Sequence, residues 1–150
     1  MSRDAGSDQE RWLHNDLAQN PSACTLAFWH RALFSSGEVR EVAEVRPLWR
    51  DLYDFNTDLV VNEHVHHYER FAPQNPDGAV DTDHGILQFT IGSGGRDLEG
   101  LFPVRENSLV RLSHHFAVLT LELGSNNYVC SDILNGGSGQ CHQKHPANAK

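Results

Sequence analysis

The stretch Thr57–Arg70, "TDLVVNEHVHHYER", joins a short apolar segment to a cluster of three histidines. Residues 57–62 are rich in branched apolar side chains and predict a buried strand. The chain then runs directly into His64, His66 and His67. This order matters for both the fold and the chemistry, because ligands of α/β proteins bind where the strands end.

The segments before this strand predict an α/β fold. Apolar residues recur at helical spacing over residues 8–19, and residues 24–30 form an apolar run that predicts a second buried strand. Residues 39–55 are mostly helical in pattern, with Pro47 in the first turn of the second part, where proline is tolerated. The order helix, strand, helix, strand is typical of a parallel βαβ unit.

The second half of the chain is expected to add antiparallel strands. Residues 72–85 are rich in proline, glycine, asparagine and aspartate and predict a long loop, and residues 86–91 predict a strand. Residues 108–134 are expected to form two or three antiparallel strands. The predicted boundaries are a disordered N-terminus at 1–7, one domain at 8–135 and a flexible tail at 136–150.

The composition indicates one globular domain with an acidic surface. The 150 residues are 39% hydrophobic and carry 20 acidic against 12 basic side chains, a net charge of -8. Neither nucleic acid nor an anionic membrane is expected as a partner, because both repel such a surface. No segment reaches the roughly 18 apolar residues of a membrane-spanning helix. The first ten residues lack the apolar core of a secretory signal peptide, and the localisation stays unknown.

The spacing of the histidines favours a metal site. In an extended segment His64 and His66 point to the same side, whereas His67 points away and is expected either to support the ligands or to be structural. His30 ends the other predicted strand, and the ends of parallel neighbours meet at one edge of the sheet. The three imidazoles of His30, His64 and His66 would then lie together. Neutral imidazole binds zinc, iron and manganese ions.

Two other patterns carry weaker signals. His114 and His115 lie inside a strand pattern, so one side chain is expected to face the core and the other to be exposed. Gly92–Gly95 follows a strand, but no helix pattern follows it. A tight turn is therefore expected there rather than a phosphate-binding loop.

Three segments carry a family resemblance: residues 24–38, 47–78 and 86–95. They resemble the C-terminal half of calcineurin-like metallophosphoesterases, in the purple acid phosphatase-like branch. The most specific match is "HVHHYERFAPQ" at residues 64–74, which is similar to the family segment G-H-x-H-x-Y-E-R. The resemblance covers nearly the whole chain, from about Gly6 to about His142.

The resemblance implies the C-terminal half of a four-layer α/β/β/α sandwich, with a βαβ-type start and antiparallel strands toward the C-terminus. It also implies hydrolysis of a phosphate monoester by metal-bound hydroxide, at a centre of two metal ions (iron, zinc or manganese). His30 and His64 would bind the second metal and His66 the first. Glu63 stands where the family has glycine, which either strains the turn or directs a carboxylate toward the metals.

The other metal ligands of the family belong to upstream motifs that this sequence does not contain. The isolated chain is therefore expected to be inactive or incomplete unless a complementing N-terminal half supplies them. Half of a sandwich would leave a sheet face and an edge uncovered, which predicts self-association. Relatives are often exported, and this resemblance is compatible with a Cys24–Cys141 disulfide.

Two other functions stay open. A single-metal module of the cupin type would use the His-x-His pair, Glu69 and a later histidine, although the helix-strand start differs from a β-sandwich. A non-catalytic remnant or interaction domain would bind no metal through its histidines. The number of metal ions bound per chain distinguishes these hypotheses.

Overall fold

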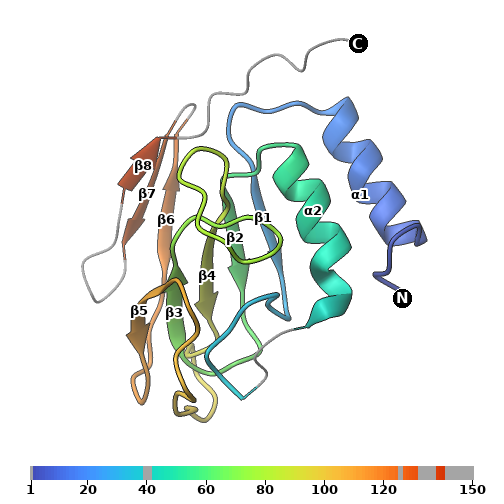
Figure 1. The fold of residues 1–150 in the computed structure, drawn as a ribbon. Helices are drawn as coiled ribbons and strands as arrows, with labels where there is room; N and C mark the ends of the chain where they lie inside the picture. Colours follow the sequence, from blue (N-terminus) through green and yellow to red (C-terminus); the bar gives the residue numbers. More distant parts are fainter. Residues whose placement is uncertain (1, 39–41, 125–126, 132–137, 141–150) are drawn as a thin grey trace.

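The computed structural model describes residues 2–38, 42–124, 127–131 and 138–140 (Figure 1). Its helices are α1 (Asp8–Gln19) and α2 (Arg46–Asp54), and a single 3-10 turn, η1 (Ala43–Val45), leads into α2. Its strands are β1 (Leu26–Trp29), β2 (Leu59–Asn62), β3 (Tyr68–Phe71), β4 (Leu87–Ile91), β5 (Ser108–Leu112), β6 (Thr120–Leu123), β7 (Asn127–Ser131) and β8 (Ser138–Gln140).

The larger sheet has five strands in the order β1-β2-β4-β3-β5. Strands β1, β2 and β4 are parallel, and β3 pairs antiparallel with both β4 and β5. Strands β6, β7 and β8 form a second, antiparallel sheet. The predicted βαβ start and the antiparallel C-terminal strands are confirmed, and both helices lie on one side of the larger sheet (Figure 1). This arrangement gives the cupin-like alternative no support.

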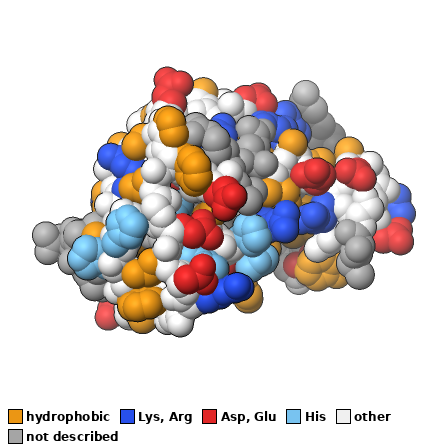
Figure 2. All heavy atoms as spheres, turned by 90° about the horizontal axis from the view of Figure 1, so that it is seen from below, with side chains coloured by type: hydrophobic (Ala, Val, Ile, Leu, Met, Phe, Trp, Pro, Cys, Tyr) orange, Lys and Arg blue, Asp and Glu red, His pale blue; other side chains and the backbone are white. Residues whose placement is uncertain are grey.

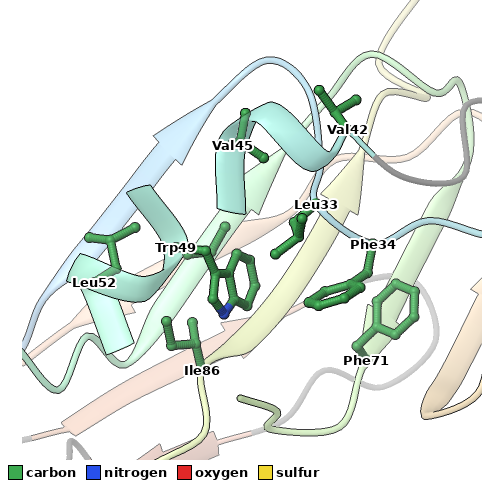
Figure 3. Packing of buried hydrophobic residues seen from close by; sticks show 9 residues of the cluster. Leu33, Phe34, Val42, Val45, Trp49, Leu52, Phe71 and Ile86 are labelled. Carbon is green, nitrogen blue, oxygen red and sulfur yellow. The ribbon is translucent and has the colours of Figure 1, made fainter. Parts of the chain in front are cut away.

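Apolar side chains fill both faces of the larger sheet. On the helix side, Trp49 packs edge-on against Phe34, with ring centroids 5.4 Å apart (Figure 3). It also packs edge-on against Trp29, with ring centroids 6.2 Å apart. Pro47 lies in the first turn of α2, and the helix buries Leu48, Trp49 and Leu52. The remaining buried members of this cluster are Leu33, Val42, Val45, Val60, Phe71 and Ile86.

The opposite face of the sheet carries a smaller cluster. Its buried members are Leu59, Tyr68 and Phe89, and Leu119 and Leu121 pack against it from the neighbourhood of β6. The second sheet therefore contributes to covering the face that the helices leave open. No helix in the described part of the chain is long and apolar enough to cross a membrane.

Two local expectations were wrong, and one strand was not expected. Residues 24–30 were predicted to form a buried strand, but β1 is an edge strand and Phe28 is 79% exposed. Strand β3 was not predicted, because Glu69 and Arg70 make its sequence polar. His114 and His115 were placed in a strand, but both lie exposed in the bend after β5.

The ends of the chain were predicted to be unstructured. At the N-terminus, Ser7 caps α1, its side-chain oxygen accepting a hydrogen bond from the Glu10 N–H at 3.2 Å. At the other end, β8 lies inside the segment expected as a tail, and the rest of that segment is outside the described residues.

Cys24 is disulfide-bonded. The side chain of Cys130 and the whole of Cys141 lie outside the described residues. The pairing of Cys24 with Cys141 therefore stays a prediction.

We expect the contact between α1 and α2 to depend on pH through His14. Its Nδ1 lies 3.0 Å from the Asp51 carboxylate, and this hydrogen bond raises the pKa of His14 above its ordinary value of 6.5. Because the pKa of His14 is higher in the folded than in the unfolded state, protonated His14 stabilises the fold. This contribution is complete below the unfolded-state pKa and is lost as the pH rises through the folded-state pKa. Burial also raises the pKa of Asp51, because it penalises the ionised carboxylate, and this penalty offsets part of what the contact with His14 contributes.

Urea unfolding of His14→Ala should therefore show a larger loss of stability at about pH 5.5 than at about pH 8.5. His115→Ala is the matched control, because His115 is an exposed histidine far along the chain from this helix pair. An equal loss at the two pH values for His14→Ala would contradict the assignment.

Candidate metal centre

The parallel pairing of β1 and β2 places their ends side by side. Trp29 is in register with Asn62, and the Asn62 side-chain amide donates to the Trp29 carbonyl at 2.9 Å. One residue further, the Glu63 N–H donates to the His30 carbonyl at 3.0 Å. The strand ladder thus continues past the last strand residues and holds the two chain segments that carry the histidines together.

His30 and His64 are in direct contact. His64 Nδ1 lies 2.9 Å from His30 Nε2, and the rings are nearly perpendicular, at 76°. Burial lowers the pKa of His64, and the Arg31 charge and His30 lower it further. Both effects favour the neutral imidazole, which is the form that binds metal ions. On its other side, His30 Nδ1 lies 3.7 Å from the Glu63 carboxylate.

The segment that carries the histidines is a tight turn rather than the predicted extended segment. The Val65 N–H donates to the Glu63 carbonyl at 2.6 Å, and the His67 N–H donates to the Val65 carbonyl at 2.9 Å. His64 has a backbone φ of 50°, in the left-handed region that residues other than glycine rarely adopt. A Cβ on Gly92 would lie 2.1 Å from the Val65 carbonyl oxygen, so this glycine allows β4 to approach the turn.

His66 faces two carboxylates that the sequence analysis missed. Its Nδ1 lies 3.5 Å from Asp97 and 3.6 Å from Glu99. Both acids lie in the loop after β4, which is the parallel neighbour of β2. The signal that could have found them is their position shortly after the glycine turn that ends this strand.

These side chains surround one open pocket of about 400 Å³. It is lined by His30, Glu38, His64, Val65, His66, Arg96, Asp97 and Glu99. Figure 2 looks onto the lower end of the molecule in Figure 1, where histidine, acidic and basic side chains gather on one face. The structure therefore brings all three predicted ligands to one pocket, together with carboxylates and an arginine.

The donor types suit a metal ion, but the donors do not surround one point. Among residues 2–38 and 42–124, no three histidine, cysteine, aspartate or glutamate side chains are placed to hold a metal. His66 Nδ1 and Glu99 Oε2 are nevertheless buried in the pocket wall without a hydrogen-bond partner there. Two polar atoms of the pocket wall therefore lack a hydrogen-bond partner. Binding a cation would require further donors or a movement of side chains.

His67 lies outside this pocket, as expected for a structural residue. It is fully buried, and its Nε2 lies 3.3 Å from the Glu69 carboxylate. Glu69 is itself fully buried on β3. The third histidine of the cluster therefore points into the protein, and the other two line the opening.

Comparison with known proteins gives a consistent set of relatives. No protein-family model matches the chain. Over 102 residues, which are 63% of this chain and 19% of the relative, it is 37% identical to purple acid phosphatase 15 of Arabidopsis thaliana. It is 35% identical over 104 residues to the probable purple acid phosphatase 20 of Arabidopsis thaliana, covering 64% of this chain and 24% of that protein. The matched part is thus about a fifth to a quarter of each of these relatives.

Solved structures share the fold at lower sequence identity. Purple acid phosphatase PPD1 from yellow lupin (Lupinus luteus) seeds has a TM-score of 0.78 at 20% identity, over 88% of this chain and 27% of that one. GAP50, the anchor in the inner membrane complex of Plasmodium, has a TM-score of 0.68 at 17% identity, over 92% of this chain and 43% of that one. The fold thus occurs both in a phosphatase and in an anchor protein.

The close approach at Gly92 predicts a specific defect. In Gly92→Ala the new Cβ would meet the Val65 backbone, so the turn or β4 must move. We expect a loss of about 1–3 kcal/mol in the free energy of unfolding and changed ring ¹⁵N signals of His64 and His66. Gly94→Ala is the matched control, because nothing lies within 4 Å of its added Cβ. Equal stability and equal ring signals in the two variants would show that the turn does not depend on Gly92.

Proposed function

The chain resembles the C-terminal portion of purple acid phosphatase-like metallophosphoesterases in sequence and in fold, and on that premise we propose that it contributes three histidine ligands to a phosphoesterase metal centre. The observation that carries the proposal is the contact between His30 Nε2 and His64 Nδ1 in the pocket that His66 also lines. By the family pattern, His30 and His64 would hold the second metal and His66 the first.

The proposed centre holds two cations, iron, zinc or manganese. Bound cations would polarise a phosphoryl oxygen and lower the pKa of an attacking water. The residues of this chain have simpler tasks. The Glu63 carboxylate faces Nδ1 of His30, and those of Asp97 and Glu99 face Nδ1 of His66, so these carboxylates would help to orient the two rings.

Arg96 supports a phosphate ester as the substrate class. It lines the same pocket, and its Nε lies 2.8 Å from the Asp97 carboxylate. A guanidinium at this position would attract a phosphate dianion and orient its oxygens. The surrounding carboxylates would repel the same dianion unless cations neutralised them, so substrate binding and metal binding are expected to depend on each other.

We propose that the chain does not hydrolyse phosphate esters by itself. Two cations need more donors than three imidazoles, and the described side chains bring no three candidate donors to one point. The missing oxygen ligands would come from a complementing polypeptide that covers the pocket. The partner is thus identified by its chemistry, as a segment that carries carboxylates.

A second candidate is a non-catalytic interaction domain. The lack of a preassembled group of three donors in the described part of the chain favours it. The similarity to the fold of a protein described as an anchor is compatible with such a role.

Zinc titration distinguishes the two candidates. If the histidines are ligands, the chain binds Zn²⁺, and His64→Ala weakens binding by at least the roughly 10- to 100-fold typical of losing a residue that only supports a ligand. His115→Ala, an exposed histidine outside the pocket, should leave the affinity unchanged. Equal affinities in all three proteins would contradict the ligand assignment, and failure of the wild-type chain to bind Zn²⁺ would favour the interaction domain.

A phosphatase assay tests the need for a partner. Hydrolysis of p-nitrophenyl phosphate by the isolated chain, with zinc, iron or manganese added, should stay at the level of the metal ions alone. Turnover by the wild-type chain that His66→Ala abolishes would contradict the proposal that the site is incomplete.

A further inference from the structure

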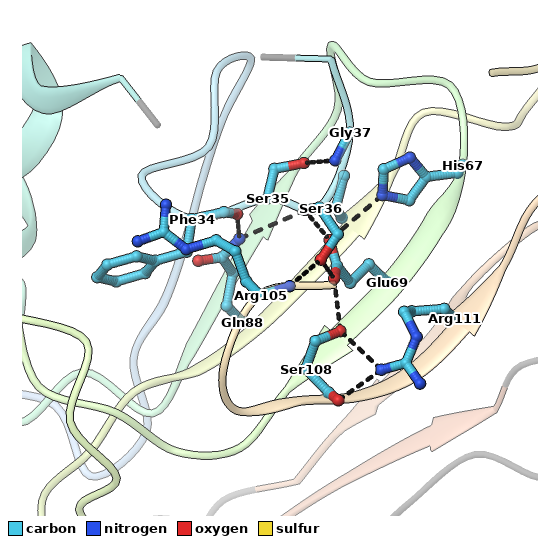
Figure 4. Close-up of polar contacts among 11 residues, drawn as sticks. Phe34, Ser35, Ser36, Gly37, His67, Glu69, Gln88, Arg105, Ser108 and Arg111 are labelled. Atoms are coloured by element: carbon cyan, nitrogen blue, oxygen red, sulfur yellow. Dashed lines mark hydrogen bonds and ion pairs between the residues drawn. The ribbon is translucent and has the colours of Figure 1, made fainter. Parts of the chain in front are cut away.

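One buried carboxylate collects hydrogen bonds from several distant segments. Glu69 is fully buried on β3 and accepts hydrogen bonds from the Ser36 N–H at 2.8 Å and the Ser36 hydroxyl at 2.5 Å. The Ser108 hydroxyl and His67 Nε2 donate to the same carboxylate (Figure 4). A buried charge is costly unless it is fully hydrogen-bonded, and four donors meet this requirement.

The ionised state of this carboxylate follows from its partners. Burial alone would raise the pKa of Glu69, but the hydrogen bonds from His67, Ser108 and Ser36 together lower it. An ionised carboxylate can only accept, so its four contacts require four donors. A glutamine would direct an N–H₂ group at donors, which would break part of the network.

Two of the three residues that donate to Glu69, Ser36 and His67, belong to segments that form walls of the histidine pocket, whereas Ser108 begins β5. Ser36 lies two residues before Glu38, and His67 directly follows His66. The third wall, the loop that carries Asp97 and Glu99, reaches the network through Ser36, whose hydroxyl accepts the Arg105 N–H at 2.9 Å and whose carbonyl accepts the Phe102 N–H at 3.0 Å. The Glu99 N–H also donates to the His66 carbonyl at 3.1 Å.

Packing leaves these walls little room to shift. A Cβ on Gly37 would lie 2.6 Å from Val65 Cγ1 and 2.9 Å from His67 Cε1. The loop after β1 therefore lies directly on the turn at residues 63–67. The network and this contact together hold the loop after β1, the turn after β2 and the loop after β4 in one arrangement.

We infer that Glu69 is a positioning residue, which sets the arrangement of His30, His64 and His66 by holding the three walls of their pocket. It touches neither the pocket opening nor the predicted ligands, and it acts through Ser36, Ser108 and His67. The metal-binding part of this inference rests on the proposed function, whereas the arrangement of the rings does not.

The test compares Glu69→Gln with Asp58→Asn in the full chain. Asp58 is also a buried carboxylate, and it accepts the Thr25 N–H at 2.8 Å. It precedes β2, however, whereas the pocket follows that strand. Both variants should lose stability. Only Glu69→Gln should change the ring ¹⁵N and ¹H signals of His30, His64 and His66 in metal-free protein, and weaken Zn²⁺ binding about 10- to 100-fold.

The outcomes separate a positioning role from a merely structural one. If Glu69→Gln unfolds more easily but keeps wild-type ring signals, the inference is overturned. If Glu69→Gln does not fold, Ser108→Ala decides, since it removes one donor and keeps the carboxylate; it should shift the ring signals, and unchanged signals would overturn the inference. If the wild-type chain binds no Zn²⁺, the proposed function fails and the metal-free ring signals alone decide about Glu69.

Discussion

The parallel pairing of β1 with β2 is the constraint on which the rest of the structure depends. Two parallel neighbours cannot be joined by a tight turn, so the chain must cross over one face of the sheet, and α2 forms this crossover. The crossover buries Trp49 against the sheet and builds the larger core. The same pairing ends both strands at one level, which brings His30 against His64.

Local patterns were enough to predict this part of the fold. Helical spacing, the proline in the first turn of α2 and two apolar runs gave the βαβ unit, and the parallel arrangement then placed His30 near the later histidines. Strand β3 could not be predicted in the same way. Glu69 makes it polar, and the donors that allow this carboxylate to be buried lie 33 and 39 residues away in the sequence.

His64 and His66 line one pocket, but the backbone between them differs from the one that their spacing predicted. Period-two spacing predicted that His64 and His66 share a site because the segment is extended. They share the pocket because the segment folds into a turn, with His64 in the left-handed region and Val65 against Gly92. Neither the positive φ nor the close approach can be inferred from spacing, since both depend on a strand about 25 residues further along the chain.

Different parts of this molecule stabilise the fold and fix the positions of the loops around the pocket. The apolar cluster around Trp49 buries large side chains, and such a core tolerates small shifts of its members. The network around Glu69 adds less to stability, because a buried charge must first lose its hydration. Its four hydrogen bonds are directional, however, and each is satisfied in only one arrangement of the loops. A buried carboxylate is therefore suited to hold a pocket in place, where an apolar side chain of equal size would only fill the space.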